Sequence, residues 1–109
     1  MVRALAERFP DFGVEGEIYV TAPGAEIDEN HELVGAIDAA HTEVFGEQPG
    51  RDVTRWFSDA SALTAYGIPT VNYGTSTGLM EPGKGESLEI DGLVRTAEVY
   101  ARVARTVCG

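Results

Sequence analysis

Histidines are the first residues to test for metal binding or acid–base chemistry, and the sequence has two, His31 and His41. Both fall on one expected helix, where their Cα atoms would be separated by about 15 Å along the axis and about 80° around it. They cannot share one zinc ion. We therefore expect each histidine to have a structural role, and we expect no metal ligand among them.

Carboxylates near the carboxyl end form a second group, which comprises Glu81, Glu86, Glu89 and Asp91. Such a group can contribute to an oxygen-ligand metal site or form an acid–base pair. The chain has 18 acidic against 8 basic residues and a formal net charge of −10, so a solvated acidic loop is the stronger interpretation. The same charge would repel a phosphate backbone, and we expect no nucleic-acid partner.

Hydroxyls and glycines gather at the ends of two expected strands, where α/β proteins place their ligands. Residues 74–78 can hold a carboxylate or phosphate or can form a plain turn, and they lack the Gly-Lys-Ser/Thr of a Walker loop. Ser58 has no Gly-x-Ser-x-Gly elbow, so no catalytic serine is expected. The residues expected to line a substrate-binding wall are Ser58, Asp59, Gly74, Thr75 and Ser76.

Alternating helices and strands are expected to position these residues. The apolar spacing predicts a helix from Asn30 to Gly46 and a final helix capped by Asp91. In the final helix the residues expected to face inward are Leu93, Val94, Ala97, Tyr100, Ala101 and Ala104. The other expected elements are helices over residues 2–9 and 59–66 and strands over residues 14–20, 53–57 and 68–73.

This order predicts an α/β fold, a partial three-layer sandwich in which the two strands around Phe57 and Val71 are neighbours. Two central strands are too few to cover the apolar faces of the flanking helices. We therefore expect the chain to complete a larger sheet whose first strands lie upstream in a longer protein. Alone, it should expose apolar surface and self-associate, as a homo-oligomer or less specifically.

Three segments, residues 56–61 (WFSDAS), 66–74 (YGIPTVNYG) and 85–94 (GESLEIDGLV), occur in an order that resembles a known family. It is the zinc metallopeptidase and deacylase family that includes acetylornithine deacetylase, succinyl-diaminopimelate desuccinylase, aminoacylase and glutamate carboxypeptidase. The similarity is to the carboxy-terminal third of these enzymes and runs from about Phe9 to the end of the chain.

The resemblance implies a two-zinc, phosphorylase/hydrolase-like catalytic domain with an inserted lid domain that mediates dimerisation. Such enzymes cleave an amide bond of N-acyl amino acids or small peptides with a metal-bound water and a glutamate base. On this mapping residues 1–23 are the last helix and strand of the lid, and residues 24–109 are the carboxy-terminal part of the catalytic domain.

The family's main metal ligands and general base have no counterpart in this sequence. Neither histidine is followed two residues later by Asp, and no Glu-Glu pair occurs. The family's last metal-binding histidine lies a few residues before the position of Glu86, but residues 74–86 contain no histidine, although Glu81 could substitute for it. We therefore expect zinc in the full-length parent enzyme, none in this chain alone, and a fragment without independent catalysis. The alternative is a free-standing acidic α/β module that binds a small anion.

The remaining composition indicates a cytoplasmic globular protein. Charged residues interrupt the first segment where a signal peptide needs an apolar core, and no apolar run is long enough to span a membrane. Cys108 is the single cysteine, so no internal disulfide can form, and we expect an inert thiol there.

Overall fold

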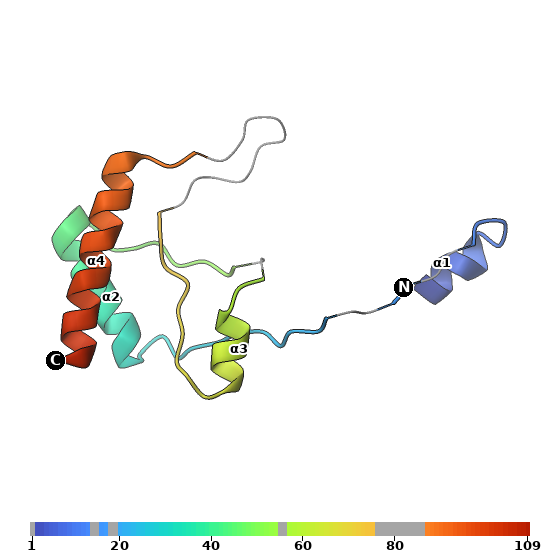
Figure 1. The fold of residues 1–109 in the computed structure, drawn as a ribbon, viewed down its shortest axis with the longest axis horizontal. Coiled ribbons are helices and arrows are strands. Elements are labelled where there is room, and N and C mark those ends of the chain that lie inside the picture. Colours follow the sequence, from blue (N-terminus) through green and yellow to red (C-terminus); the bar gives the residue numbers. More distant parts are fainter. Residues whose placement is uncertain (1, 14–15, 18–19, 55–56, 76–86) are drawn as a thin grey trace.

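The computed structural model describes residues 2–13, 16–17, 20–54, 57–75 and 87–109, within which the chain forms four helices (Figure 1). In chain order these are α1 (Val2–Arg8), α2 (Glu32–Phe45), α3 (Ala60–Ala65) and α4 (Ile90–Cys108). Helices α2 and α4 pack together at one end of the molecule, and α1 stands apart at the other. The α2–α4 pair is therefore the structural centre of the chain.

Helix α2 confirms the predicted helix but begins one residue later than expected. His31, not Asn30, is the N-cap, and its Nδ1 accepts a hydrogen bond from the backbone N–H of Leu33 at 3.1 Å. The backbone N–H of Asn30 instead donates to the carboxylate of Asp28 at 2.8 Å and lowers the pKa of Asp28. The helix ends as predicted at Gly46, whose φ of +82° suits a residue without a Cβ.

Helix α4 also confirms a predicted helix, with a different start. Glu89 occupies the N-cap position, and Asp91, the expected cap, lies in the first turn. Asp91 pairs with Arg95 one turn later at 3.2 Å, and Arg105 lies in the last turn. An acidic first turn and a basic last turn both complement the helix dipole.

The small core lies where α2 and α4 meet. Val99 is completely buried, and Ala40 of α2 and Thr96 of α4 are 6% and 7% exposed. Arg102 of α4 forms an ion pair with Glu43 of α2 beside this contact. Because these side chains at the contact are short, the two helices can approach closely.

The predicted inward face of α4 is wrong. Leu93, Val94 and Tyr100 are 52%, 62% and 53% exposed, and Ala97, Ala101 and Ala104 are exposed as well. Apolar residues occupy more than half of the helix circumference, whereas α2 can cover one side only. Thr96 and Val99 face α2, and the longer apolar stripe lies outside.

A cluster of aromatic rings connects α2, α4 and the segment between them. The Nδ1 of His41 lies 2.6 Å from the hydroxyl of Tyr73, and the imidazole stacks on Phe45 with ring centroids 4.4 Å apart. The hydroxyl of Tyr100 donates to the backbone carbonyl of Tyr73. Burial, followed by the proximity of Tyr100, raises the pKa of Tyr73.

The predicted α/β sandwich is contradicted, because the described residues contain no β-strand. The segments around Val53 and residues 68–73 are extended but do not form a sheet, and Phe57 and Val71 are not on paired strands. Residues 14–15, 18–19 and 55–56, which belong to two expected strands, lie outside the described part. Branched side chains favour extended backbone, but a strand also requires a partner for its N–H and C=O groups.

The amino-terminal segment makes the molecule long. The principal extents are 61 × 37 × 18 Å and the radius of gyration is 19.4 Å, against about 13 Å for a compact chain of about 100 residues. Figure 1 shows α1 at the end of an extended segment that leads away from α2. The domain boundary at residues 23 and 24 stays a prediction.

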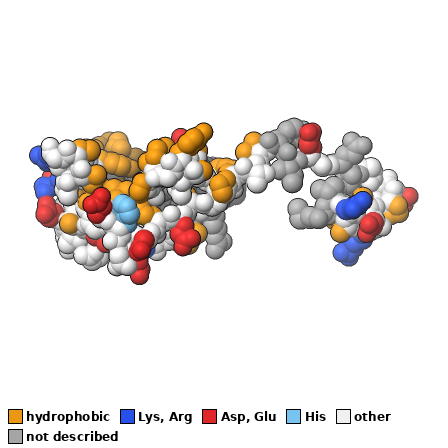
Figure 2. Space-filling view, turned by 90° about the horizontal axis from the view of Figure 1, so that it is seen from below, with side chains coloured by type: hydrophobic (Ala, Val, Ile, Leu, Met, Phe, Trp, Pro, Cys, Tyr) orange, Lys and Arg blue, Asp and Glu red, His pale blue; other side chains and the backbone are white. Residues whose placement is uncertain are grey.

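Large apolar side chains cover much of the surface of the helical body (Figure 2). The most exposed are Ile90, Val53, Phe57 and Tyr66, each at least 77% exposed. Among the described residues, no helix is long and apolar enough to cross a membrane.

Candidate functional site

A cavity of about 310 Å³ lies beside Ser58, one of the predicted wall residues. We call it the Ser58 pocket. Three extended segments, 25–27, 52–54 and 70–72, form its walls together with Ser58 and the start of α3. Segments distant in the sequence therefore meet at a predicted site residue, although no sheet holds them.

Hydrogen-bonding groups dominate the Ser58 pocket. The side-chain amide of Asn72 donates to the hydroxyl of Ser58 at 3.2 Å, and Ser61 and Thr70 add further hydroxyls. Hydroxyl and amide groups bind a neutral amide through hydrogen bonds and can both donate and accept. The pocket thus has the chemistry to hold a polar, uncharged group.

Two carboxylates, Glu26 and Asp52, set the charge of the Ser58 pocket. Their negative charge disfavours a carboxylate or phosphate ligand in this cavity and favours a neutral or cationic one. Asp59, the N-cap of α3, adds a third acidic group beside Ser58, and its side chain makes no capping hydrogen bond. The anion site expected at residues 74–78 is a different feature, and residues 76–78 lie outside the described part of the chain.

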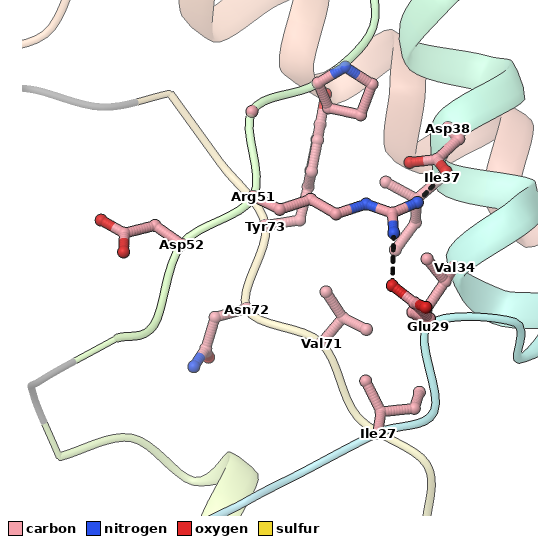
Figure 3. A pocket seen from close by; sticks show the side chains of 12 residues that line it. Ile27, Glu29, Val34, Ile37, Asp38, Arg51, Asp52, Val71, Asn72 and Tyr73 are labelled. Atoms are coloured by element: carbon pink, nitrogen blue, oxygen red, sulfur yellow. Dashed lines mark hydrogen bonds and ion pairs between the residues drawn. The ribbon is translucent and has the colours of Figure 1, made fainter.

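A second cavity of about 240 Å³, the Arg51 pocket, lies between α2 and the extended segments (Figure 3). Its apolar wall is formed by Ile27, Val34, Ile37 and Val71. The guanidinium of Arg51 crosses the cavity to Asp38 at 2.5 Å and to Glu29 at 3.7 Å. Because two carboxylates already neutralise Arg51, an anionic ligand would have to displace them.

The two pockets share a wall. Ile27, Asp52, Val71 and Asn72 line both of them. In Figure 3 the side chains of Asp52 and Asn72 point away from the guanidinium of Arg51. The apolar and ionic side of this wall therefore faces α2, and its hydrogen-bonding side faces α3 and Ser58.

The structure does not bring all five predicted wall residues together. Ser58 lines its pocket and Asp59 lies beside it, whereas Gly74 and Thr75 line neither of the two cavities. The methyl group of Thr75 instead packs against α4, where a Cβ added to Gly92 would lie 3.1 Å from it. Ser76 lies outside the described residues.

The described residues do not fit a catalytic zinc site. His31 is engaged as the cap of α2, and His41 is bonded to Tyr73. No group of three or more His, Cys, Asp or Glu side chains suited to a metal occurs in the part of the chain that the structure describes. Glu81 and Glu86 lie outside that part, whereas Glu89 and Asp91 begin α4.

Sequence reasoning missed the most organised polar contacts near the site. Asn72 and Tyr73 were assigned to an expected strand, without a partner for either side chain. Their adjacent positions were a usable signal, because neighbouring residues of an extended segment point to opposite sides and so contact different elements. In the structure Asn72 contacts Ser58 on one side and Tyr73 contacts His41 on the other. Arg51 gave no such signal, because its two carboxylate partners are distant in the sequence.

Comparison with known proteins identifies the family. Residues 12–106 match the sequence model described as peptidase family M20/M25/M40. Searches of curated proteins and of solved structures each returned no significant match. The family match includes α2, α3, both pockets and all but the last two residues of α4, and it covers most of the chain. The chain therefore belongs to peptidase family M20/M25/M40.

Proposed function

We propose that this chain is the carboxy-terminal part of a metal-dependent amidohydrolase that cleaves an amide bond of N-acyl amino acids or small peptides. The observation that carries the proposal is the family match over residues 12–106. In this role the Ser58 pocket supplies part of the substrate-facing wall. Its hydroxyls and the amide of Asn72 suit the neutral amide of such a substrate better than its carboxylate.

In this proposal the chain does not hydrolyse the substrate by itself. The sequence has no His-x-Asp and no Glu-Glu pair, which the resemblance assigns to the metal site and the general base. The large apolar side chains on its surface also suit a chain that packs against further protein. A metal-bound water in the parent enzyme would act on the substrate, and the residues that hold the metal would lie outside the described part of this chain.

The binding role of the Ser58 pocket is tested with the purified chain. Nuclear magnetic resonance titration with an N-acetyl amino acid amide, which carries no carboxylate, should shift the backbone signals of Ser58, Ser61 and Asn72. Ser58→Ala should weaken these shifts, whereas Ser87→Ala, at an exposed serine outside the pocket, should leave them unchanged. Equal shifts in all three proteins would contradict the assignment of the wall.

The catalytic part is tested by assaying the chain with zinc against N-acetyl amino acids and dipeptides. We expect no turnover above a no-protein control, and turnover by the chain alone would refute the proposal. The genomic sequence upstream of Met1 gives an independent test. An open frame that encodes His-x-Asp and Glu-Glu supports a parent enzyme, whereas a stop codon and a ribosome-binding site would favour a free-standing binding protein.

A further inference from the structure

The walls of the Ser58 pocket are extended segments that belong to no sheet. Segments 25–27, 52–54 and 70–72 line the cavity, and within the described part of the chain no backbone hydrogen bond joins any two of them. In a sheet, the N–H and C=O groups of paired strands would fix such segments. Side chains must therefore hold these walls in place.

Arg51 makes contacts that can hold one of these walls. It directly precedes segment 52–54, and its guanidinium reaches Asp38 of α2 at 2.5 Å (Figure 3). The same guanidinium reaches Glu29, which follows segment 25–27, at 3.7 Å. Because a guanidinium carries several donors in fixed directions, one arginine can join two carboxylates. Arg51 thus connects two wall segments to each other and to α2, which packs in the core.

The contact with Asp38 is the stronger of the two. The side chain of Asp38 is 23% exposed and that of Glu29 is 78% exposed, and water and salt weaken an exposed ion pair. Asp38 also lies in the middle of α2, so the helix holds its carboxylate in place. Arg51 itself is 54% exposed. The ion pair can therefore fix a connecting segment on α2, but it is too weak to decide whether α2 packs on α4.

The side chains beside Arg51 connect it to the Ser58 pocket. Asp52 and Asn72 line both cavities, and in Figure 3 they point away from the guanidinium. Adjacent residues of an extended segment face opposite sides, so holding Arg51 against α2 directs Asp52 towards the Ser58 pocket. Ser58, which accepts the hydrogen bond of Asn72, follows Arg51 by seven residues in the chain. A displaced Arg51 would therefore move the segment that leads to Ser58 away from Asn72.

We infer that Arg51 is a positioning residue for the Ser58 pocket, and that it acts by tying the 52–54 wall to Asp38 of α2. In this role Arg51 does not touch the ligand, because its guanidinium lies in the other cavity and is bound to carboxylates. The inference rests on the binding role proposed for the Ser58 pocket. It assigns a structural purpose to the Arg51 pocket, whose ion pair shapes the neighbouring binding wall.

The first test uses the protein without ligand and variants that change the charged end of Arg51. Arg51→Gln keeps part of the apolar stem but removes the ion pair, whereas Arg51→Lys keeps a charge that can reach Asp38. The side-chain amide of Asn72 lies 3.2 Å from the hydroxyl of Ser58, so a nuclear Overhauser effect should connect the two residues. This effect should be lost in Arg51→Gln and kept in Arg51→Lys.

The matched control is Arg105→Gln, which removes the same charge in the last turn of α4, away from both pockets. It should leave the nuclear Overhauser effect between Asn72 and Ser58 unchanged. Circular dichroism should stay the same in every variant, because the α2–α4 core is intact. If Arg51→Gln kept the effect at full strength, the inference would be overturned.

The second test measures the affinity of the Ser58 pocket for N-acetylalaninamide, followed at the backbone signals of Ser58 and Asn72. Because this probe is neutral, removing the charge of Arg51 cannot weaken binding through direct attraction. Arg51→Gln should raise the dissociation constant about threefold, as expected for the loss of a partly exposed ion pair. Asp38→Asn should have the same effect, and the double variant should bind no more weakly than either single variant, because both changes remove one contact. Effects that multiplied in the double variant would refute the role of this ion pair.

Together the two tests separate the role of Arg51 from the proposed function. If the wild-type chain does not bind the probe, the binding role of the Ser58 pocket fails, and the contact between Asn72 and Ser58 in the free protein still decides whether Arg51 positions the wall. If the wild-type chain binds the probe and Arg51→Gln binds it equally well, the proposed function stands and the positioning role is refuted.

Discussion

Val99 allows a direct test of whether the α2–α4 contact is the core of this protein. It is the largest side chain in the described part that is completely buried. Val99→Ala removes two methyl groups, which costs about 1.6 kcal/mol of transfer free energy. A residual cavity of about 40 Å³ adds about 1 kcal/mol, and the better helix propensity of alanine returns about 0.5 kcal/mol. We therefore expect a net loss of about 2 kcal/mol in the free energy of unfolding.

The matched control is Val94→Ala, which makes the same chemical change on the same helix at a side chain that is 62% exposed. Its stability should stay within about 0.5 kcal/mol of the wild type, because the gain in helix propensity offsets the little contact that is lost. Both variants should be measured at a concentration at which the chain is monomeric, so that self-association does not contribute to the measured stability.

Urea unfolding followed by circular dichroism at the helix signal measures both variants. With a denaturant slope of about 1 kcal/mol/M, Val99→Ala should lower the midpoint by about 2 M. If the two substitutions lowered the midpoint equally, Val99 would not be more buried than Val94 in solution. The packing of α2 on α4 would then be refuted.

Four further substitutions test local features, each by the same urea measurement. Gly35 lies in α2 with open space around it, so Gly35→Ala should raise the free energy of unfolding by about 1 kcal/mol. Gly92→Ala should raise it by less, because the new Cβ would lie 3.1 Å from the methyl group of Thr75. Equal increases for the two variants would contradict the contact between Thr75 and Gly92. Gly46→Ala should cost about 1 kcal/mol because φ is +82°, and no loss would show that α2 ends elsewhere. Burial raises the pKa of Tyr73, so the stability this group contributes is present at neutral pH and declines as the pH rises from about 10 through the raised value. Tyr73→Phe should remove this part of the alkaline loss, and an unchanged pH profile would refute the burial of the phenol.

Helices were predictable from this sequence because their signals are local. The spacing of apolar residues before Gly46 predicts the ends of α2 to within one or two positions. The pattern of residues after Glu89 predicts the start of α4 equally well. The orientation of α4 was not predictable, because it depends on how the helix packs against α2, which is distant in the sequence. Strands failed for the same reason, since an extended segment becomes a strand only when another segment pairs with it.

The structure shows where the expected wall residues lie, and their binding role stays a prediction. Ser58 was identified from its position at the end of an extended segment, and the structure places it beside a cavity. Thr75 was assigned to the same wall by analogy with sheet edges, yet it packs on Gly92 of α4. Asn72 and Tyr73 were missed because their partners, Ser58 and His41, belong to other elements. A hydrophobic or charge pattern along one segment contains no information about such pairs.

The pairing of α2 with α4 also determines how the chain tolerates changes in length. The two helices are neighbours in space, although residues 46–89 separate them in the sequence. The entropy of closing such a long connection grows only with the logarithm of its length, so that doubling it costs about 0.6 kcal/mol. Insertions at exposed positions of the connection, such as Gly50, should therefore leave the helix pair intact. The contact between α2 and α4 defines the stable unit of this protein, and the connection between these two helices can be lengthened with little loss of stability.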